Sequence, residues 1–134
     1  MDRSENMRAV RGKDTKPEKT IRSMLHRHGY RFRLHYKKLP GKPDLVFPSL
    51  GKVIFVHGCF WHSHDCRKGR TAPRTNSVFW QEKRARTVER DSKTLQALAA
   101  KGWDAYVVWE CALRDLDALR SRLEFFLSRE RRSN

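Results

Sequence analysis

Lys52-Val53-Ile54-Phe55-Val56-His57 is the stretch that decides the fold. A continuous apolar run of this length is typical of a strand buried on both faces, as in the middle of an α/β sheet. Gly51 breaks the chain before the run, and the residues from Gly58 to about Asn76 show no regular pattern. We therefore expect residues 52–57 to form the principal strand of a sheet.

The residues N-terminal to this strand predict a helix. Thr15 can cap it, Pro17 is tolerated in a first turn, and Glu18 completes a capping box with Thr15. One helical face is marked by residues at i, i+3, i+4 and i+7, namely Ile21, Met24, Leu25 and His28. Gly29 is a natural end for this helix.

Other segments complete the predicted fold. Alternating aromatic and basic residues over 30–36 predict a strand, and 43–47 predicts a short one that begins at Pro43. A long helix is expected over 77–100, a strand over 103–109, and an amphipathic helix through residues 113–127. The inner face of the long helix is predicted at Val88, Leu95, Leu98 and Ala99. The order helix, three strands, helix, strand, helix predicts an α/β fold around a small mixed sheet.

The composition indicates a nucleic-acid partner. The chain has 134 residues, which fits a single domain over 1–134 with a flexible basic arm at 1–14 and a basic tail at 129–134. Its 30 Lys+Arg and 15 Asp+Glu give a formal net charge of +15, which favours nucleic acid over an anionic membrane surface. The chain has no apolar membrane span, signal-peptide core or heptad pattern, so we expect a monomer in a reducing cytoplasm.

Cysteine and histidine residues cluster in one short segment. Cys59, His64 and Cys66 lie within eight residues, and Cys111 follows a predicted strand that could return it as a fourth ligand. Three thiolates and one imidazole suit a closed, tetrahedral structural zinc site. His62 could replace His64 as the ligand, and the plain alternative is three buried, inert thiols.

A second group of residues suggests hydrolytic chemistry. Asp44 begins a predicted strand, His57 ends the next one, and His62 follows five residues later. A carboxylate there can hold Mg²⁺, and a nearby histidine can act as general base toward a water. Glu18 could add a second carboxylate. The alternatives are that Asp44 only shapes its turn and that Glu18 is only the capping-box partner.

Aromatic residues interleaved with basic ones suggest contact with DNA. Phe60 and Trp61 lie between the candidate zinc ligands, and Trp80 begins the long helix, so these rings could wedge between base steps. The basic residues between them suit phosphate contacts: Arg67, Lys68, Arg70 and Arg74. The alternative places the rings in the core, and for Phe79 we favour that alternative.

Motifs along nearly the whole chain resemble the very short patch repair (Vsr) DNA mismatch endonucleases. The most specific are His57-Gly58-Cys59-Phe60-Trp61-His62 and Trp109-Glu110-Cys111-Ala112-Leu113. Further matching stretches are Asn6-Met7-Arg8-Ala9, Asp14-Thr15 with Glu18, Pro40-Gly41-Lys42-Pro43-Asp44, Phe79-Trp80 with Glu82-Lys83, Val88-Glu89-Arg90-Asp91 and Gly102-Trp103. The resemblance implies a restriction-endonuclease-like, three-layer α/β fold with a central mixed sheet flanked by helices.

The resemblance also implies an active site that departs from the wider superfamily. That superfamily places a second acid and a lysine where this chain has Phe55-Val56-His57, and the Vsr family shares the departure. By resemblance, Asp44 is the main Mg²⁺ ligand and the backbone carbonyl of Val56, where the family often has threonine, is a second. His62 matches the catalytic histidine, and His57 and Glu18 match supporting positions.

The remaining matched positions concern zinc and DNA. Cys59, His64, Cys66 and Cys111 match the structural zinc ligands of the family. Phe60, Trp61 and Trp80 match its intercalating aromatics, and the arm over 4–11 resembles a segment that clasps DNA.

The implied activity is a nick in one strand of duplex DNA, 5′ to the thymine of a T:G mismatch that arises when 5-methylcytosine deaminates. One alternative is a zinc-stabilised DNA-binding module without catalysis. Another is a related nuclease with a different DNA target. The expected setting is the bacterial cytoplasm.

Overall fold

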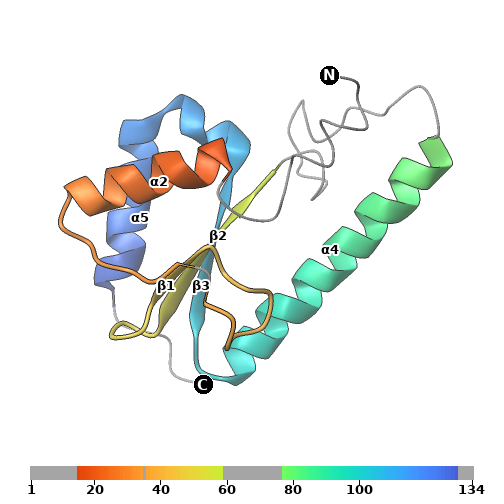
Figure 1. Cartoon of the computed structure of the whole chain (residues 1–134), viewed down its shortest axis with the longest axis horizontal. Helices are drawn as coiled ribbons and strands as arrows, with labels where there is room; N and C mark the ends of the chain where they lie inside the picture. The colour runs from red at the N-terminus through yellow and green to blue at the C-terminus, as the bar shows by residue number, and fades with distance from the viewer. Residues whose placement is uncertain (1–14, 35, 59–76, 130–134) are drawn as a thin grey trace.

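The computed structural model describes residues 15–34, 36–58 and 77–129 of the chain. Its elements are helix α2 (Lys16–Arg27), strands β1 (Leu45–Phe47) and β2 (Lys52–His57), helix α4 (Ser77–Ala100), strand β3 (Asp104–Trp109), the 3₁₀ helix η1 (Glu110–Arg114) and helix α5 (Leu116–Ser128) (Figure 1). The predicted arm at 1–14, the segment 59–76 and residues 130–134 of the tail lie outside the described residues.

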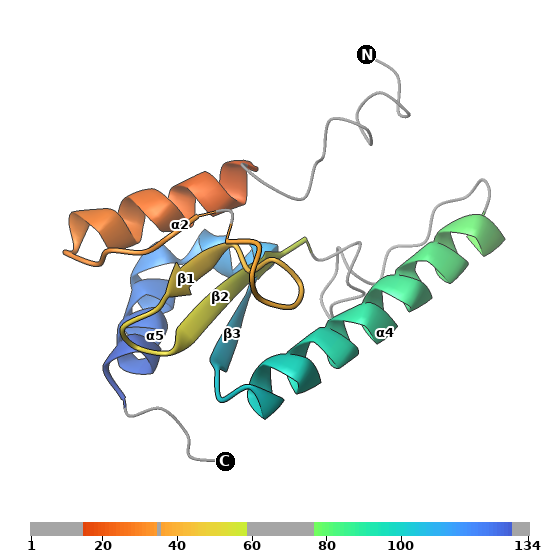
Figure 2. The same cartoon turned by 60° about the horizontal axis from the view of Figure 1, so that its bottom comes forward.

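The sheet is mixed, and β2 is its central strand. The strand order is β1-β2-β3, with β1 antiparallel and β3 parallel to β2. Helices α2 and α5 lie on one face of the sheet and α4 lies on the other (Figures 1 and 2). This three-layer arrangement confirms the predicted α/β class, and the strand over 52–57 is buried on both faces as its apolar run predicts.

Two apolar clusters hold the layers together, one on each face of β2. Ile54 points into the cluster shared with α2 and α5, and Val53 and Phe55 point into the cluster shared with α4. Both Val53 and Ile54 are fully buried. Burying one such side chain contributes about 1.5–3 kcal/mol, so the apolar run at 53–56 supplies packing to both faces at once.

The first helix begins and ends as its sequence predicts. The Thr15 hydroxyl accepts a hydrogen bond from the Glu18 backbone N–H at 3.4 Å, and the helix ends just before Gly29, which has a φ of +92°. A left-handed φ favours glycine because it has no Cβ. Among the described residues, no helix has both the length and the apolar character needed to cross a membrane.

The predicted strand over 30–36 is wrong. Among the described residues of this segment, 30–34 and 36, there is one isolated bridge, in which Arg33 and Val46 exchange backbone hydrogen bonds of 2.8 and 3.0 Å. The next hydrogen-bonded pair toward the C-terminal end of β1 would join Arg31 to Pro48. Proline has no backbone N–H, so the ladder cannot continue past that point.

The predicted inner face of α4 is only partly right. Leu98 is buried and Leu95 is half-buried against the sheet, but Val88 is 43% exposed and Ala99 is also exposed. Helix α4 has 24 residues, a length of about 36 Å, whereas the six residues of β3 span about 20 Å. The N-terminal part of α4 therefore extends beyond the sheet (Figure 2).

A buried lysine joins the start of β2 to the end of α5. The ammonium group of Lys52 donates to the backbone carbonyls of Phe126 and Arg129. Arg129 in turn lies 3.7 Å from Asp104, the first residue of β3. Carbonyls at a helix C-terminus lack partners within the helix, so a cation at this point stabilises the end of α5.

Candidate active site between strand β1, strand β2 and helix α2

Asp44 lies directly before β1 and is fixed against β2 by two hydrogen bonds. Its backbone N–H donates to the Ile54 carbonyl at 3.1 Å, and its Oδ2 accepts from the Val56 N–H at 2.6 Å. The turn before Asp44 is packed tightly on α4, because a Cβ at Gly41 would lie 2.3 Å from Cγ2 of Thr94. The carboxylate therefore has a fixed place beside the end of β2.

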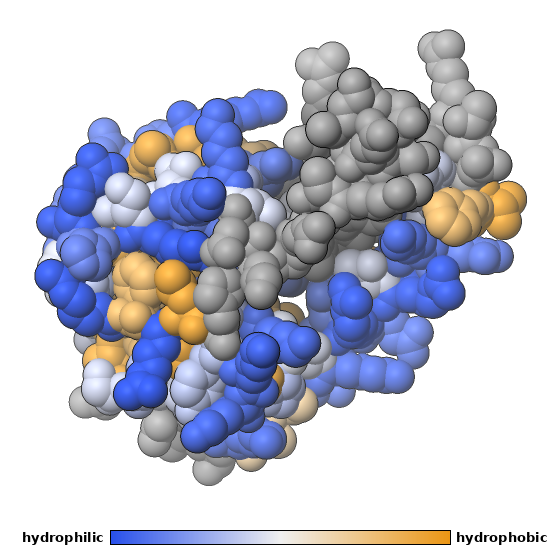
Figure 3. Space-filling model, viewed as in Figure 1, coloured by the Kyte–Doolittle hydropathy of each residue, from blue (hydrophilic) through white to orange (hydrophobic). Residues whose placement is uncertain are grey.

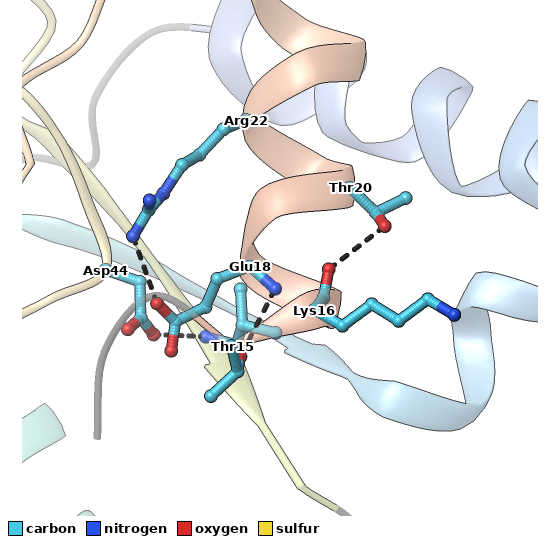
Figure 4. A network of polar contacts seen from close by, with 7 residues as sticks. Thr15, Lys16, Glu18, Thr20, Arg22 and Asp44 are labelled. Atoms are coloured by element: carbon cyan, nitrogen blue, oxygen red, sulfur yellow. Dashed lines mark hydrogen bonds and ion pairs between the residues drawn. The ribbon is translucent and has the colours of Figure 1, made fainter. Parts of the chain in front are cut away.

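Glu18 approaches Asp44 from the first turn of α2. It is only 3% exposed, and its carboxyl group lies beside that of Asp44 (Figure 4). Nη2 of Arg22, one turn further along the helix, is 3.1 Å from Oε2 of Glu18. The backbone N–H of Glu18 takes part in the cap of α2, whereas its carboxylate contacts another acid and a cation.

The paired carboxyl groups change the proton affinity of this site. The pKa of Asp44 is raised to about 7, first by burial and then by the charge of Glu18 and a hydrogen bond with its carboxyl group. The Val56 N–H and the Arg22 guanidinium act in the opposite direction and lower this pKa. When both acids are ionised, they form a pair of adjacent oxygen donors with an excess of negative charge.

The backbone of Val56 adds a third oxygen to this edge. The N–H and carbonyl of one strand residue point to the same side, and the Val56 N–H points to Asp44. The β1–β2 register runs only to the pair Leu45–Ile54, so the Val56 carbonyl faces the region beyond the start of β1. Carboxylate and carbonyl oxygens are the ligands that Mg²⁺ prefers, and they fit that ion.

The described residues alone do not form a complete metal cage. Among residues 15–34, 36–58 and 77–129, no group of three or more His, Cys, Asp or Glu side chains is arranged to hold a metal ion. Mg²⁺ commonly takes one or two carboxylates and completes its coordination with waters and substrate phosphate. Asp44, Glu18 and the Val56 carbonyl therefore suit an ion that is shared with a substrate.

His57 ends β2 at the same end of the sheet but on the other face. It is 8% exposed, its Nδ1 lies 4.0 Å from Oδ2 of Asp91 on α4, and its ring meets Trp109 edge-on at 5.3 Å. The sequence predicts that His57 and Asp44 lie at one end of the sheet, and their backbones lie there. The His57 ring faces α4, whereas Glu18 reaches Asp44 from α2.

The start of α4 presents aromatic rings outside the core. Phe79 is 51% exposed, which corrects the prediction that it packs in the core, and its ring lies 5.0 Å from that of half-buried Trp80. Val78 is 66% exposed beside them. Figure 3 shows apolar atoms gathered at this end of α4. These side chains are exposed because the first turn of α4 extends beyond the sheet, which therefore does not cover them (Figure 2).

The candidate zinc site is described only at one position. Cys111 is half-buried in η1, directly after β3. The other proposed ligands (Cys59, His64 and Cys66), the candidate general base His62 and the candidate wedges Phe60 and Trp61 lie outside the described residues.

Two residues of the site have no role in the sequence analysis. Arg22 had a signal, because a basic residue four positions after Glu18 on a helix is within reach of it. Asp91 lies in a stretch that matches the family, but its contact with His57 had no local signal, because that contact joins α4 to β2 across the fold.

We expect the stability of the metal-free protein to fall as pH rises from about 4 to about 7, because folding raises the Asp44 pKa from 3.8 to about 7. The folded state binds the proton more tightly than the unfolded state does. The full stabilisation is therefore present below the unfolded-state pKa of 3.8, and it is lost as the pH rises to the folded-state pKa of about 7. The loss is about 2–4 kcal/mol. Urea unfolding in EDTA measures it, with Asp44→Asn as the non-titrating reference. A difference between the two proteins that stays constant with pH would contradict the expectation.

Comparison with known proteins identifies the family. Residues 1–68 match the family model described as DNA mismatch endonuclease Vsr. The type II nicking enzyme V.XorIIP of Xanthomonas oryzae pv. oryzae is 54% identical over 121 residues, which cover 90% of this chain and 88% of that protein. The DNA mismatch endonuclease Vsr of Escherichia coli K12 is 44% identical over 133 residues, 96% of this chain and 85% of the relative.

A third relative, the type II nicking enzyme V.NmeAIP of Neisseria meningitidis, is 42% identical over 90% of this chain and 86% of its own length. The similarity thus extends over most of each protein. The mixed sheet with helices on both faces is consistent with a restriction-endonuclease-like fold. The chain therefore belongs to the Vsr family of DNA mismatch endonucleases.

Proposed function

We propose that this enzyme makes a Mg²⁺-dependent nick in one strand of duplex DNA, on the 5′ side of the thymine in a T:G mismatch. The observation that carries the proposal is the buried Asp44–Glu18 carboxylate pair beside the end of β2. Membership of the Vsr family makes DNA the substrate and implies a divalent metal. The net charge of +15 suits the DNA backbone.

In the proposed mechanism, Asp44 and the Val56 carbonyl would hold Mg²⁺, which polarises the phosphodiester and stabilises the charge that develops on it. The Val56 N–H orients the Asp44 carboxylate through the 2.6 Å hydrogen bond. Glu18 adds negative charge next to Asp44, which would strengthen the binding of a divalent cation there. His62 is the proposed general base toward the attacking water.

His57 is proposed as a supporting residue rather than the base. Its Nδ1 lies 4.0 Å from Oδ2 of Asp91, so the ring is held beside a carboxylate at the end of the sheet where the DNA backbone is proposed to bind. The buried ring cannot move far, because Trp109 and α4 enclose it. Its proposed role is therefore that of a fixed, supporting side chain rather than one that exchanges a proton with water.

The preference for a mismatch is proposed to come from distortion of the duplex. Trp80, with Phe60 and Trp61, would wedge between base steps, and a wobble pair resists this less than a matched pair does. Exposure of the first turn of α4 supports the part assigned to Trp80. The arm at 1–14 is proposed to clasp the DNA.

Structural support and setting complete the proposal. One structural Zn²⁺ would be bound by Cys59, His64, Cys66 and Cys111. It would tie the segment between β2 and α4 to η1. The enzyme is proposed to act as a single-domain monomer in the bacterial cytoplasm, where reducing conditions keep thiols available for zinc.

The test is a nicking assay on duplexes labelled on each strand. T:G duplexes with several flanking sequences are compared with matched T:A duplexes, in Mg²⁺ and in EDTA. We expect one product, cut 5′ to the mismatched thymine, in Mg²⁺ alone. Equal cleavage of matched DNA would discard the mismatch target and leave a nuclease with another target. Binding without cleavage in any duplex would favour the module without catalysis.

A further inference from the structure

Arg22 forms an ion pair that solvent hardly reaches. Its side chain is 15% exposed and that of its partner Glu18 is 4% exposed, at a separation of 3.1 Å. The pair Lys93–Glu89 on α4 has the same i,i+4 spacing and a separation of 3.2 Å, but its side chains are 75% and 66% exposed. Water and salt screen the exposed pair, so only the buried one has a large effect on its surroundings.

The position of Arg22 gives it a second target. Its guanidinium points from α2 toward Asp44 as well as toward Glu18 (Figure 4). Its charge acts on Asp44 in the direction that favours the ionised carboxylate. Two ionised carboxylates side by side in a poorly solvated place repel one another, and a positive charge beside them reduces that repulsion.

We propose that Arg22 is a positioning residue, an internal counter-ion that holds Glu18 against Asp44 while no divalent cation is bound. The inference rests on the proposed function in one respect, namely that a divalent cation binds at this pair. When the cation arrives, it supplies the positive charge that Arg22 supplied before. The carboxylates are therefore already in place for the cation, and little rearrangement accompanies its binding.

One consequence needs no metal to be tested. The stability contributed by Arg22 should depend on the charge of Asp44, although the two residues lie on different elements. Neutralising Asp44 removes both the repulsion and one target of the guanidinium. Loss of Arg22 should then matter less, and a double-mutant cycle measures that coupling.

The first experiment is this cycle in EDTA at about pH 8, which lies above the raised pKa of Asp44. Thermal unfolding is measured for the parent, Arg22→Gln, Asp44→Asn and the double variant. We expect Arg22→Gln to lower the melting midpoint by about 5 °C in the parent and by less than half of that in the Asp44→Asn background. Arg22→Lys should recover part of the loss, and Lys93→Gln should change little in either background. An equal cost of Arg22→Gln in both backgrounds would overturn the proposal.

The second experiment adds Mg²⁺ to the same proteins. We expect Mg²⁺ to raise the parent midpoint, to leave that of Asp44→Asn unchanged, and to shrink the deficit of Arg22→Gln to less than half. A deficit that is equal with and without Mg²⁺, in a parent that responds to the ion, would show a merely structural ion pair and overturn the proposal. If the parent itself does not respond, the metal site of the proposed function fails, and the metal-free cycle alone decides the role of Arg22.

Discussion

Asp44→Asn is expected to abolish nicking, with a loss of at least about 10³-fold in rate under conditions where the parent cleaves to completion. The amide keeps the shape of the side chain, and its oxygen can still accept from the Val56 N–H. What is lost is the negative charge that would hold the cation and, through it, stabilise the transition state. Single-turnover nicking of the T:G duplex in saturating Mg²⁺ measures the effect.

The controls separate chemistry from folding and binding. Fluorescence anisotropy should show that Asp44→Asn binds the duplex within about threefold of the parent, because backbone contacts dominate affinity. Asp117→Asn is the matched control. It makes the same change in charge at a carboxylate in the first turn of α5 that is 90% exposed and has no proposed role in the site. It should nick at the parental rate. Parental nicking by Asp44→Asn would remove Asp44 from the mechanism.

The elements that are defined by local patterns could be predicted from the sequence. The boundaries of β2 and α4 agree with the ranges expected for them, 52–57 and 77–100. Each has a signal within its own residues: a continuous apolar run between glycines in β2, and a long helical stretch ended by Gly102 in α4. Helix α2 has a cap at Thr15 and a glycine just beyond its end, which are also local.

The errors arose where a partner segment decides the structure. Residues 30–36 alternate like a strand, but the pairing depends on β1, and Pro48 removes the donor that a longer ladder requires. Which residues of α4 are buried depends on how far the sheet extends beneath the helix. The periodicity of the helix sequence carries no information about the extent of the sheet. Val88 has the spacing of a core residue and lies where there is no sheet to cover it.

The same distinction applies to the candidate site. Asp44 and Glu18 could be singled out from sequence because the family motifs contain them, and their closeness is a result of how α2 packs on β1 and β2. The i,i+4 spacing on a helix could have predicted the ion pair of Arg22 with Glu18. It could not have predicted the effect of Arg22 on Asp44, which lies on another element. The contact of His57 with Asp91 needed the fold, because 34 residues separate them in the chain.

Cys111 is the described member of the proposed zinc site, and it lies in η1, directly after β3. Strands β2 and β3 are parallel, and their last pair is His57–Trp109. Cys111 follows Trp109 by two residues and Cys59 follows His57 by two residues. Two residues of chain span at most about 7 Å, so Cys111 lies near the end of the sheet at which β2 also ends.

Cys111→Ser is therefore expected to lower bound zinc from about one ion per chain to well below that, and to lower the melting midpoint by about 10 °C. A serine hydroxyl is a poor zinc ligand because it stays protonated, and a structural zinc site contributes directly to folding free energy. Zinc content and thermal unfolding are measured on the same preparation. The parent stripped of zinc with a chelator is the reference and should melt close to the variant. A variant that keeps its full zinc content and the parental midpoint would exclude Cys111 as a ligand, and the thiols at 59 and 66 would then need another partner.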